Sequence, residues 1–291
     1  MPVSARQLVK DISHLVSLPD VCLHIGQVLE DPNSSAMDMA DLVSRDPALT
    51  ARLLKIANSP YFGFPSKIDT LSRAITIIGT QDLYQLVLAT AAIDSIENTE
   101  LDAGMLEKFW QHSLMTGLIS RDLARKSTTP VMHVERMFVA GLLHDIGSLV
   151  MAIRIPELSK VMLRCADKLD MSISQAERNI FDLDHGEVGA ELMANWQLPG
   201  MMQDTARFHH EPELSNNHQL EISLVHMANW ASMTATYSRF DFDYDEPLSD
   251  FAMNMTGIGF EEVKQAINIA RKEFLMIERS FFSREVSRKA G

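Results

Sequence analysis

The chain has 291 residues, 46% of them hydrophobic, and a formal net charge of -13 at pH 7. This length and composition are enough to bury a large core, in one domain or two. The negative charge repels phosphate backbones, and only the short tail SREVSRKAG offers a basic run that could offset it locally. General nucleic-acid binding is therefore not expected.

Two cysteines occur, Cys22 and Cys165, each in an apolar segment and neither in a CxxC pattern. Such cysteines favour buried thiols in a reducing compartment over a disulfide framework. The N-terminus MPVSARQLVKDISHLVSLP lacks an uninterrupted apolar core with a cleavage-like end, and no clean apolar run of about 18 residues occurs. We expect a soluble, cytoplasmic protein that does not associate with membranes.

Helical start and stop signals recur along the chain, whereas strand-like alternation is hard to find. The sequence therefore predicts an all-α fold, and it shows no internal repeat. The first clear helix covers about 47–58. Asp46 can cap it, Pro47 suits its first position because the missing N–H costs nothing there, and Pro60 marks its end.

Two short helices with a tight turn are predicted next. Gly79 can end one of them in a left-handed conformation, and Thr80 can cap the other, over about 81–92. This layout also fits a helix-turn-helix. The second helix contains no Lys or Arg to contact phosphate or guanine, so we favour packing over DNA binding.

Amphipathic helices dominate the rest of the chain. They are predicted over FWQHSLMTGLISRDLARK, VERMFVAGLLHDIGSLVMAI, DHGEVGAELMANW and EISLVHMANWASMTA. The acidic run DFDYDEPLSD, residues 241–250, is expected to be a solvated loop. A last helix is predicted over about 260–282, where polar and apolar residues alternate at helical spacing.

Ionisable residues interrupt the apolar stretch GLLHDIGSLVM. On a helix, one narrow stripe at spacing i, i+3, i+4 and i+7 would carry Gly141, His144, Asp145 and Ser148. A buried polar group without a partner costs roughly 2–7 kcal/mol. We therefore expect His144 and Asp145 to face a shared polar site.

Further histidines can join this site. A similar stripe on the preceding helix consists of His112, Ser113, Thr116 and Ser120. His185 opens a later helix, and His209 and His210 precede a helix-breaking EPE. Imidazole and carboxylate groups suit zinc, iron, manganese or nickel, an Asp can bridge two ions, and a mixed His/Asp set disfavours a cysteine-type structural zinc site.

Each histidine taken singly could instead hydrogen-bond a backbone carbonyl, which is the commoner role of a buried histidine. We expect this role for the remaining histidines: His14, His24, His133, His218 and His226.

A family resemblance is carried by FWQHS, GLLHDIG, DLDHGEVGAELMANWQLP and FHHEP. Together they resemble the HDOD domain, a bacterial signalling module related to the HD superfamily of metal-dependent phosphohydrolases. LVSLPDV, LVSRDPALTARLLKIANSPYFG and AITIIGTQDLYQLVLA are similar to the family's first helical subdomain. The resemblance runs from about 15 to 215. It implies an N-terminal helical subdomain over about 15–100, an HD-like core over 101–215, and a C-terminal helical extension over 216–291 that completes the HD-like half.

The resemblance also implies a site for a divalent metal such as Fe, Mn, Zn or Ni. The implied ligands are His112, His144, Asp145, His185 and His209 or His210. In a working hydrolase, metal-bound hydroxide would attack a phosphorus centre, and His144 and Asp145 would be the catalytic pair that holds the metal.

Two positions depart from the pattern of active HD enzymes. In those enzymes a further Asp from a later helix completes the ligand set, whereas the matching segment LVHMANW has Asn229 there, a weaker and neutral donor. Some two-metal relatives place a Glu one turn before the first histidine, where this chain has Lys108. A GYP-type motif near the third histidine is also absent from the sequence, so the cyclic-dinucleotide specificity of HD-GYP relatives does not carry over.

The leading hypothesis is a regulatory protein with a degenerate metal site, weakly active or inactive, that acts mainly by binding a signalling protein partner. The alternative is an active metal-dependent phosphohydrolase or phosphodiesterase acting on a nucleotide or cyclic dinucleotide, which the retained histidines and Asp145 support. DNA binding through residues 70–92 is a third hypothesis, which the charge disfavours.

Overall fold

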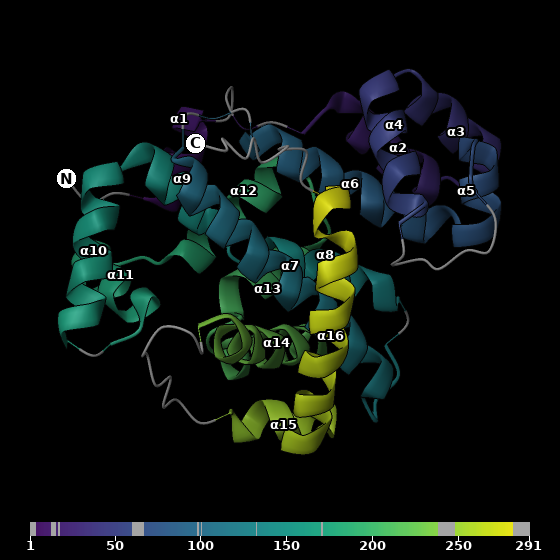
Figure 1. Cartoon of the computed structure of the whole chain (residues 1–291). Coiled ribbons are helices and arrows are strands. Elements are labelled where there is room, and N and C mark those ends of the chain that lie inside the picture. Colours follow the sequence, from purple (N-terminus) through teal and green to yellow (C-terminus); the bar gives the residue numbers. More distant parts are fainter. Residues whose placement is uncertain are drawn as a thin grey trace, which may run out of the picture.

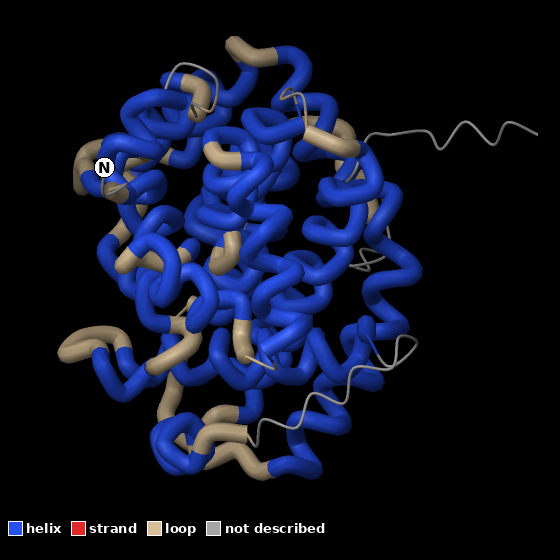
Figure 2. Tube along the Cα trace, turned by 90° about the vertical axis from the view of Figure 1, so that its left-hand side faces the viewer, coloured by secondary structure: helices blue, strands red, loops and turns tan. Residues whose placement is uncertain are grey.

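Helices form all the regular secondary structure that the computed structural model describes, which confirms the predicted all-α class (Figures 1 and 2). The described residues are 4–12, 16, 18–59, 67–97, 99, 101–131, 133–169, 171–237 and 248–281. Four features of the sequence lie wholly or mostly outside them: His14, Pro60, the acidic run 241–250 and the basic tail.

The first part of the chain forms the helices α1 (Ala5–Ile12), α2 (Asp20–Glu30), α3 (Ala36–Ser44), α4 (Pro47–Ala57), α5 (Leu71–Ile78) and α6 (Thr80–Glu97). Helices α2 to α5 form a compact group at one end of the molecule (Figure 1), and α6 packs against this group and against α8 (Val134–Leu143). Helix α1 lies apart from them, against α9 (Ile146–Arg154) and α12 (His185–Asn195).

Local sequence signals mark the start of α4 and the end of α5. Asp46 accepts hydrogen bonds from the backbone N–H groups of Ala48 and Leu49, and Pro47 opens α4, as predicted. Gly79 ends α5 with a φ of 94°, a region that favours glycine, as the sequence also predicted.

Helix α6 is a core element. It runs to Glu97 and not to about 92, because buried apolar residues such as Ile93 and Ile96 continue its packing past the expected end. Most of its residues from Leu83 to Ile96 are buried, so the second helix of the helix-turn-helix layout is used for packing.

The second part of the chain is centred on α7 (Ala103–Lys126), which packs against α8 (Val134–Leu143), α14 (Gln219–Tyr237) and α16 (Phe260–Phe281). Besides α9 and α12, its other helices are α10 (Pro156–Leu169), α11 (Ile173–Phe181), α13 (Gly200–Phe208), η1 (Pro212–Leu214) and α15 (Asp250–Thr256). The predicted last helix, about 260–282, agrees with α16. Residues distant in sequence are thus brought to both sides of α7.

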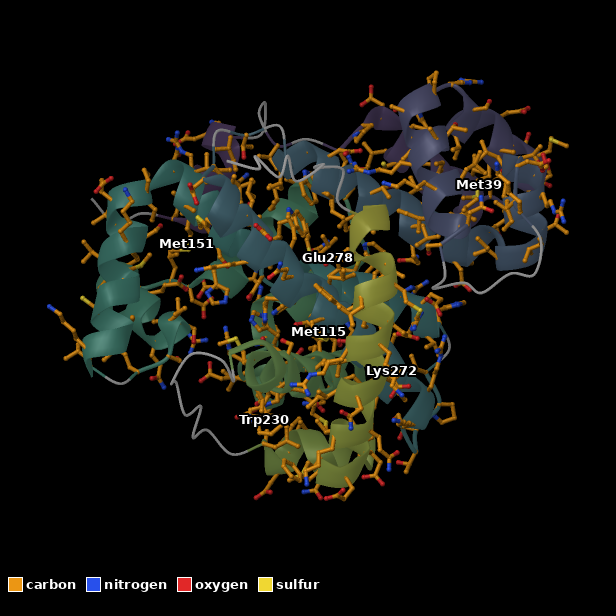
Figure 3. All side chains as sticks on the ribbon, in the orientation of Figure 1. Met39, Met115, Met151, Trp230, Lys272 and Glu278 are labelled. Atoms are coloured by element: carbon orange, nitrogen blue, oxygen red, sulfur yellow. The ribbon has the colours of Figure 1, made fainter. Side chains whose placement is uncertain are left out.

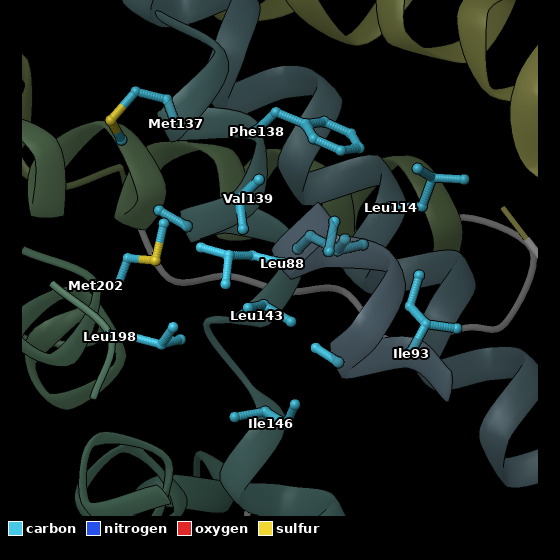
Figure 4. Close-up of a cluster of buried hydrophobic side chains, with 14 of the residues drawn as sticks. Leu88, Ile93, Leu114, Met137, Phe138, Val139, Leu143, Ile146, Leu198 and Met202 are labelled. Atoms are coloured by element: carbon cyan, nitrogen blue, oxygen red, sulfur yellow. The ribbon is translucent and has the colours of Figure 1, made fainter. Parts of the chain in front are cut away.

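The core is continuous and apolar. Met39 lies inside the first group of helices and Met115 on α7 in the centre of the molecule (Figure 3). Around the start of α9, Leu143 and Ile146 are fully buried among side chains of other helices (Figure 4). The intervening pair, His144 and Asp145, is therefore embedded in a hydrophobic surround.

One described segment, Val134–Arg154, is long and apolar enough to cross a membrane, with a mean hydropathy of 1.5. Within the molecule, 78% of its apolar window is buried. The segment comprises α8 and α9, and the turn between them holds His144 and Asp145. Its hydrophobicity is thus explained by packing in the core.

Cys22 is expected to resist alkylation in the folded protein. Burial, and secondarily the charge of Asp46, raises the pKa of its thiol to about 12, so the native thiol stays protonated where an unfolded thiol, with a pKa of about 8.5, ionises. Stability linked to this group is present below about pH 8.5 and is lost as pH rises towards 12. Mass spectrometry after iodoacetamide treatment at pH 8 should show label on the partly exposed Cys165 before Cys22. Equal labelling rates would contradict the buried position of Cys22.

Candidate metal centre

The turn between α8 and α9 supplies the central pair of the site. His144 is fully buried, and its Nδ1 lies 2.7 Å from the backbone oxygen of Gly141. Asp145 has a φ of -97° and a ψ of 8°, and both the backbone and the side chain of Ser148 donate to its carbonyl oxygen. The predicted continuous helical stripe is therefore wrong: the helix breaks at this pair, and Gly141 faces α7 instead of the site.

Helix α7 supplies His112. The side chain of Asp102 caps this helix by accepting from the backbone N–H of Met105, which sets where its polar stripe begins. His112 is nearly buried, and its Nδ1 lies 3.0 Å from the Oγ of Ser232 on α14. Thr116, one turn further along α7, also contacts Ser232 Oγ, at 2.8 Å. His112 and Thr116 therefore face α14, whereas Ser120, the last member of the predicted stripe, lies against Gly141 of α8.

The chain from α11 to η1 supplies the remaining histidines. Asp184 caps α12 by accepting from the backbone N–H of Glu187, and His185 is the first residue of that helix. His209 follows the last turn of α13 and is fully buried, while His210 is partly buried. All the candidate histidines thus lie within or next to a helix.

The carboxylate of Asp145 lies at the centre of the imidazoles. Its Oδ1 is 3.2 Å from the Nε2 of His185 and 3.2 Å from the Nε2 of His209. Its Oδ2 is 3.3 Å from the Nε2 of His144 and 3.5 Å from the Nε2 of His112. Four imidazoles therefore present the same ring atom to one carboxylate.

His210 completes the arrangement from outside, with its Nε2 2.9 Å from the Nε2 of His185. The possible ligand atoms form two groups, and within each group the atoms lie within 4.8 Å of one another. The first, which we call the His185 cluster, contains Asp145, His185, His209 and His210; the second, the His112 cluster, contains His112, His144 and Asp145. Asp145 belongs to both, as a bridging carboxylate would.

Hydrogen bonds on the far side of the rings fix which nitrogen faces inward. The Nδ1 of His144 lies 2.7 Å from the carbonyl oxygen of Gly141, and that of His209 lies 2.8 Å from the carbonyl oxygen of Ala206. A carbonyl oxygen only accepts, so each Nδ1 carries a proton. In a neutral ring this leaves Nε2 with a free lone pair directed at Asp145.

The other two rings near Asp145 also have partners for Nδ1. The Nδ1 of His112 lies 3.0 Å from Ser232 Oγ, a hydroxyl that can accept from the ring while it donates to the carbonyl oxygen of Asn229, 2.9 Å away. The Nδ1 of His185 lies 2.6 Å from Oε2 of Glu177, a buried carboxylate that accepts it. Hydrogen-bonding partners that hold a ring in this way are characteristic of histidines that ligate metals.

The inward atoms fit a cation. Several buried side-chain atoms of the described residues lack a hydrogen-bond partner, and three of them face this site: Nε2 of His144, Nε2 of His209 and Oδ1 of Asp145. Nitrogen lone pairs that point at a carboxylate repel its negative charge, unless protons or a metal ion lie between the nitrogen and oxygen atoms. Nitrogen and oxygen ligands of this kind suit zinc, iron, manganese or nickel, so the donor set fits a divalent metal.

The close approach of these groups shifts the pKa values of Asp145 and His185. Burial alone raises the pKa of Asp145, but the charge of His144 and hydrogen bonds from the surrounding histidines outweigh it, so the pKa lies well below its usual value. Burial alone lowers the pKa of His185, but the charge of Glu177 and the contact with Asp145 raise it well above its usual value. Asp145 is therefore ionised, and His185 is the ring that most readily holds a positive charge.

His209 and His210 behave in the opposite way. Burial lowers the pKa of both, and neighbouring histidines add to the decrease. Neutral imidazole is the form that binds a metal. These two residues are thus held in a state suited to act as ligands.

Two residues that matter to the site were missed by sequence reasoning. Glu177 looks like an ordinary surface acid of α11, since charged residues are almost never fully buried unless paired. Ser232 is one of many small polar residues in α14. A sequence signal that would single out either residue is lacking, because their role depends on partners 8 and 120 residues away.

Asn229 lies on the part of α14 that contacts two of these histidines. On α14 it lies between His226, whose Nδ1 donates to the carbonyl oxygen of His209, and Ser232, which contacts His112. Residues at spacing i, i+3 and i+6 lie within one face of a helix. Lys108, one turn before His112 on α7, is exposed.

The fold and the site define a class of protein: an all-helical protein with a buried centre of histidines and an aspartate. The family model of the HDOD domain matches residues 15–212. The chain therefore belongs to the HDOD family, as the resemblance had indicated.

Individual relatives agree with this assignment. An uncharacterised protein of Treponema pallidum (strain Nichols) is 30% identical over 235 residues, which span 77% of this chain and 43% of that relative. A crystal structure of a candidate phosphohydrolase from Shewanella amazonensis SB2B has a TM-score of 0.74 at 21% identity, covering 94% of this chain and 98% of the other. A candidate signal transduction protein from Marinobacter aquaeolei VT8 has a TM-score of 0.72 at 20% identity, covering 94% and 60% of the two chains. These likenesses show a shared fold.

Proposed function

We propose that this HDOD protein is a signalling regulator with a degenerate HD-type metal site, which acts mainly by binding a protein partner. The observation that carries the proposal is the position of Asn229. It lies on α14 between His226 and Ser232, which contact His209 and His112, and the family resemblance puts the further Asp of HD enzymes at this position. Asp145 is then the ligand that contributes negative charge directly.

Charge explains why this centre is a weak catalyst. One carboxylate offsets half of the charge of a divalent ion, and the imidazoles are neutral donors. Glu177 is engaged with His185 and does not replace the missing carboxylate. The affinity of the site for an ion is therefore lower, so the metal that hydrolysis requires is bound less completely.

The alternative, an active phosphohydrolase or phosphodiesterase on a nucleotide or cyclic dinucleotide, is favoured by a different observation. The Nε2 atoms of four histidines approach Asp145 within 3.5 Å. A bound metal would supply an activated water at neutral pH. In that case His144 and Asp145 hold the ion, and the fold resembles a candidate phosphohydrolase.

We expect the purified protein to contain or take up a divalent metal and to hydrolyse phosphoesters slowly or not at all. Metal analysis of protein purified without added metal or chelator tests the first part. Assays with generic phosphoesters and cyclic dinucleotides, with Mn or Fe added, test the second. Robust turnover that disappears in both His144→Ala and Asp145→Ala would establish the enzyme instead.

An Asn229→Asp substitution is expected to tighten metal binding. Asn and Asp are nearly isosteric, but the carboxylate adds one negative charge and a better donor. Without metal the change should be neutral to destabilising, because the new carboxylate lacks a partner. Titration with Mn or Zn and melting curves with and without metal measure both effects. Equal affinity in the two proteins would place Asn229 outside the metal's reach.

The binding surface that we propose comprises the N-terminal helical subdomain, about residues 15–100, together with the HD-like half. The division into this subdomain, a core over 101–215 and an extension over 216–291 is part of the proposal. The proposed partner is a signalling protein, and the chain itself is proposed to be bacterial and cytoplasmic. Nucleic acid and membranes are not expected as partners, since the net charge of -13 repels phosphate backbones and anionic lipid headgroups alike.

A further inference from the structure

Glu177 is a buried acid that reaches the site from α11. Its side chain is 4% exposed, and one oxygen, Oε2, accepts two hydrogen bonds from His185. The backbone N–H of His185 donates at 2.8 Å and the ring Nδ1 at 2.6 Å. A single carboxylate oxygen thus holds both the start of α12 and the ring of its first residue.

This contact distinguishes His185 from the other inward-facing rings. The Nδ1 atoms of His144 and His209 contact carbonyl oxygens, and that of His112 contacts a hydroxyl oxygen. All three partners are neutral. Hydrogen bonds to an ionised acceptor are shorter and roughly twice as strong as neutral ones. His185 is therefore the ring with a carboxylate behind it.

A carboxylate behind an imidazole has two effects on the opposite nitrogen. It holds a proton on Nδ1, so that Nε2 is the nitrogen that binds a metal once any proton there has been released, and its negative charge makes the Nε2 lone pair a stronger donor. In this protein Nε2 of His185 points at Oδ1 of Asp145, 3.2 Å away. The effect of Glu177 is therefore directed into the His185 cluster.

We propose that Glu177 is a positioning residue that makes His185 the strongest neutral ligand of the centre, so that the His185 cluster takes up a divalent ion before the His112 cluster does. The inference rests on the proposed metal-binding function and adds to it the order in which the two clusters bind ions. Glu177 acts through His185 and is not itself a ligand, because its Oε2 is used on the far side of the ring.

The test compares Glu177→Gln with Asp184→Asn in the full chain. Both variants neutralise a buried carboxylate at the start of α12, since the Asp184 side chain is 1% exposed and caps that helix through Glu187. Asp184 pairs with Arg178, whereas Glu177 contacts the ring of His185. Asn can still cap the helix, so Asp184→Asn reports the loss of a neighbouring buried charge, and a difference between the two variants reports the loss of the carboxylate behind the ring.

Cobalt(II) is the probe, because its visible absorption reports the ligands of each ion as it binds. Glu177→Gln should weaken the first Co²⁺ bound by about 10–100-fold, the range for loss of such a partner, and should change its spectrum. Asp184→Asn should bind the first ion as the wild type does. Equal first-ion affinities and spectra in both variants would overturn the proposal, as would equal weakening in both.

A second measurement does not depend on metal or on the folding of a variant. In the metal-free wild type, nitrogen-15 NMR of the imidazoles should show His185 with its proton on Nδ1 and a strongly deshielded Nδ1–H, as a short bond to a carboxylate produces. A proton on Nε2 alone would refute the role of Glu177. If the wild type takes up no cobalt while His185 shows the Nδ1–H form, the metal-binding function fails and the ring positioning stands.

Discussion

Gly147→Ala is expected to lower the free energy of unfolding by at least about 3 kcal/mol, at the upper end of the usual cost of overpacking. A Cβ at this position would overlap the carbonyl oxygen of His185 and lie 2.5 Å from the backbone nitrogen of Gly189. Both obstacles are backbone atoms, so a side-chain rotation cannot relieve the clash. Helix α12 must move away from α9, and His185 moves with it away from Asp145.

The loss should appear as a fall in melting temperature of roughly 6–12 °C for a domain of this size, together with weaker metal binding. Gly200→Ala is the matched control, because a Cβ there meets no atom within 4 Å. At that position alanine should be neutral or stabilise by about 0.4–1 kcal/mol through the unfolded state. A Gly147→Ala protein as stable as Gly200→Ala would show that α9 and α12 are further apart than described.

Asp145→Asn is expected to abolish metal binding and leave the fold intact. The substitution removes the charged ligand that both clusters share, so the affinity for Mn or Zn should fall by more than about 100-fold, beyond the loss typical of an indirect partner. In the metal-free protein the amide N–H groups can donate to the Nε2 lone pairs that face this position. The melting temperature without metal should therefore change little.

Metal titration by calorimetry and melting curves with and without metal measure the two parts separately. Asp122→Asn is a suitable control, because it also removes one negative charge from a largely buried carboxylate. Asp122 pairs with Lys126, away from the imidazoles. This variant should bind metal as the wild type does. Wild-type affinity in Asp145→Asn would remove the carboxylate from the ligand set and with it the proposed centre.

Much of the fold was predictable because its signals are local. Asp46 and Pro47 mark the start of α4 through contacts within three residues, and Gly79 ends α5 through its own backbone. The candidate site residues could be chosen because histidine is unusual within apolar helical stretches. Their convergence on Asp145 could be expected only through the family resemblance, since spacing along the chain does not bring separate helices together.

The remaining features depend on tertiary contacts that leave no periodic pattern. The break between α8 and α9 at His144 follows from the way Asp145 turns towards the rings, and the sequence there reads as one continuous helix. Helix α6 continues to Glu97 because other helices cover its last turns. Glu177 resembles any exposed acid until the position of His185 is known.

The rings of His144 and His209 are each held by a carbonyl oxygen three residues earlier in the chain. The orientation of each ring is thus set by a hydrogen bond within one turn of the chain, before any ion binds. An arriving metal has little rotamer freedom to remove, which saves roughly 0.5–1.5 kcal/mol for each side chain already immobilised. Uptake of the ion should accordingly resemble docking into a rigid frame, with nearly the same backbone before and after.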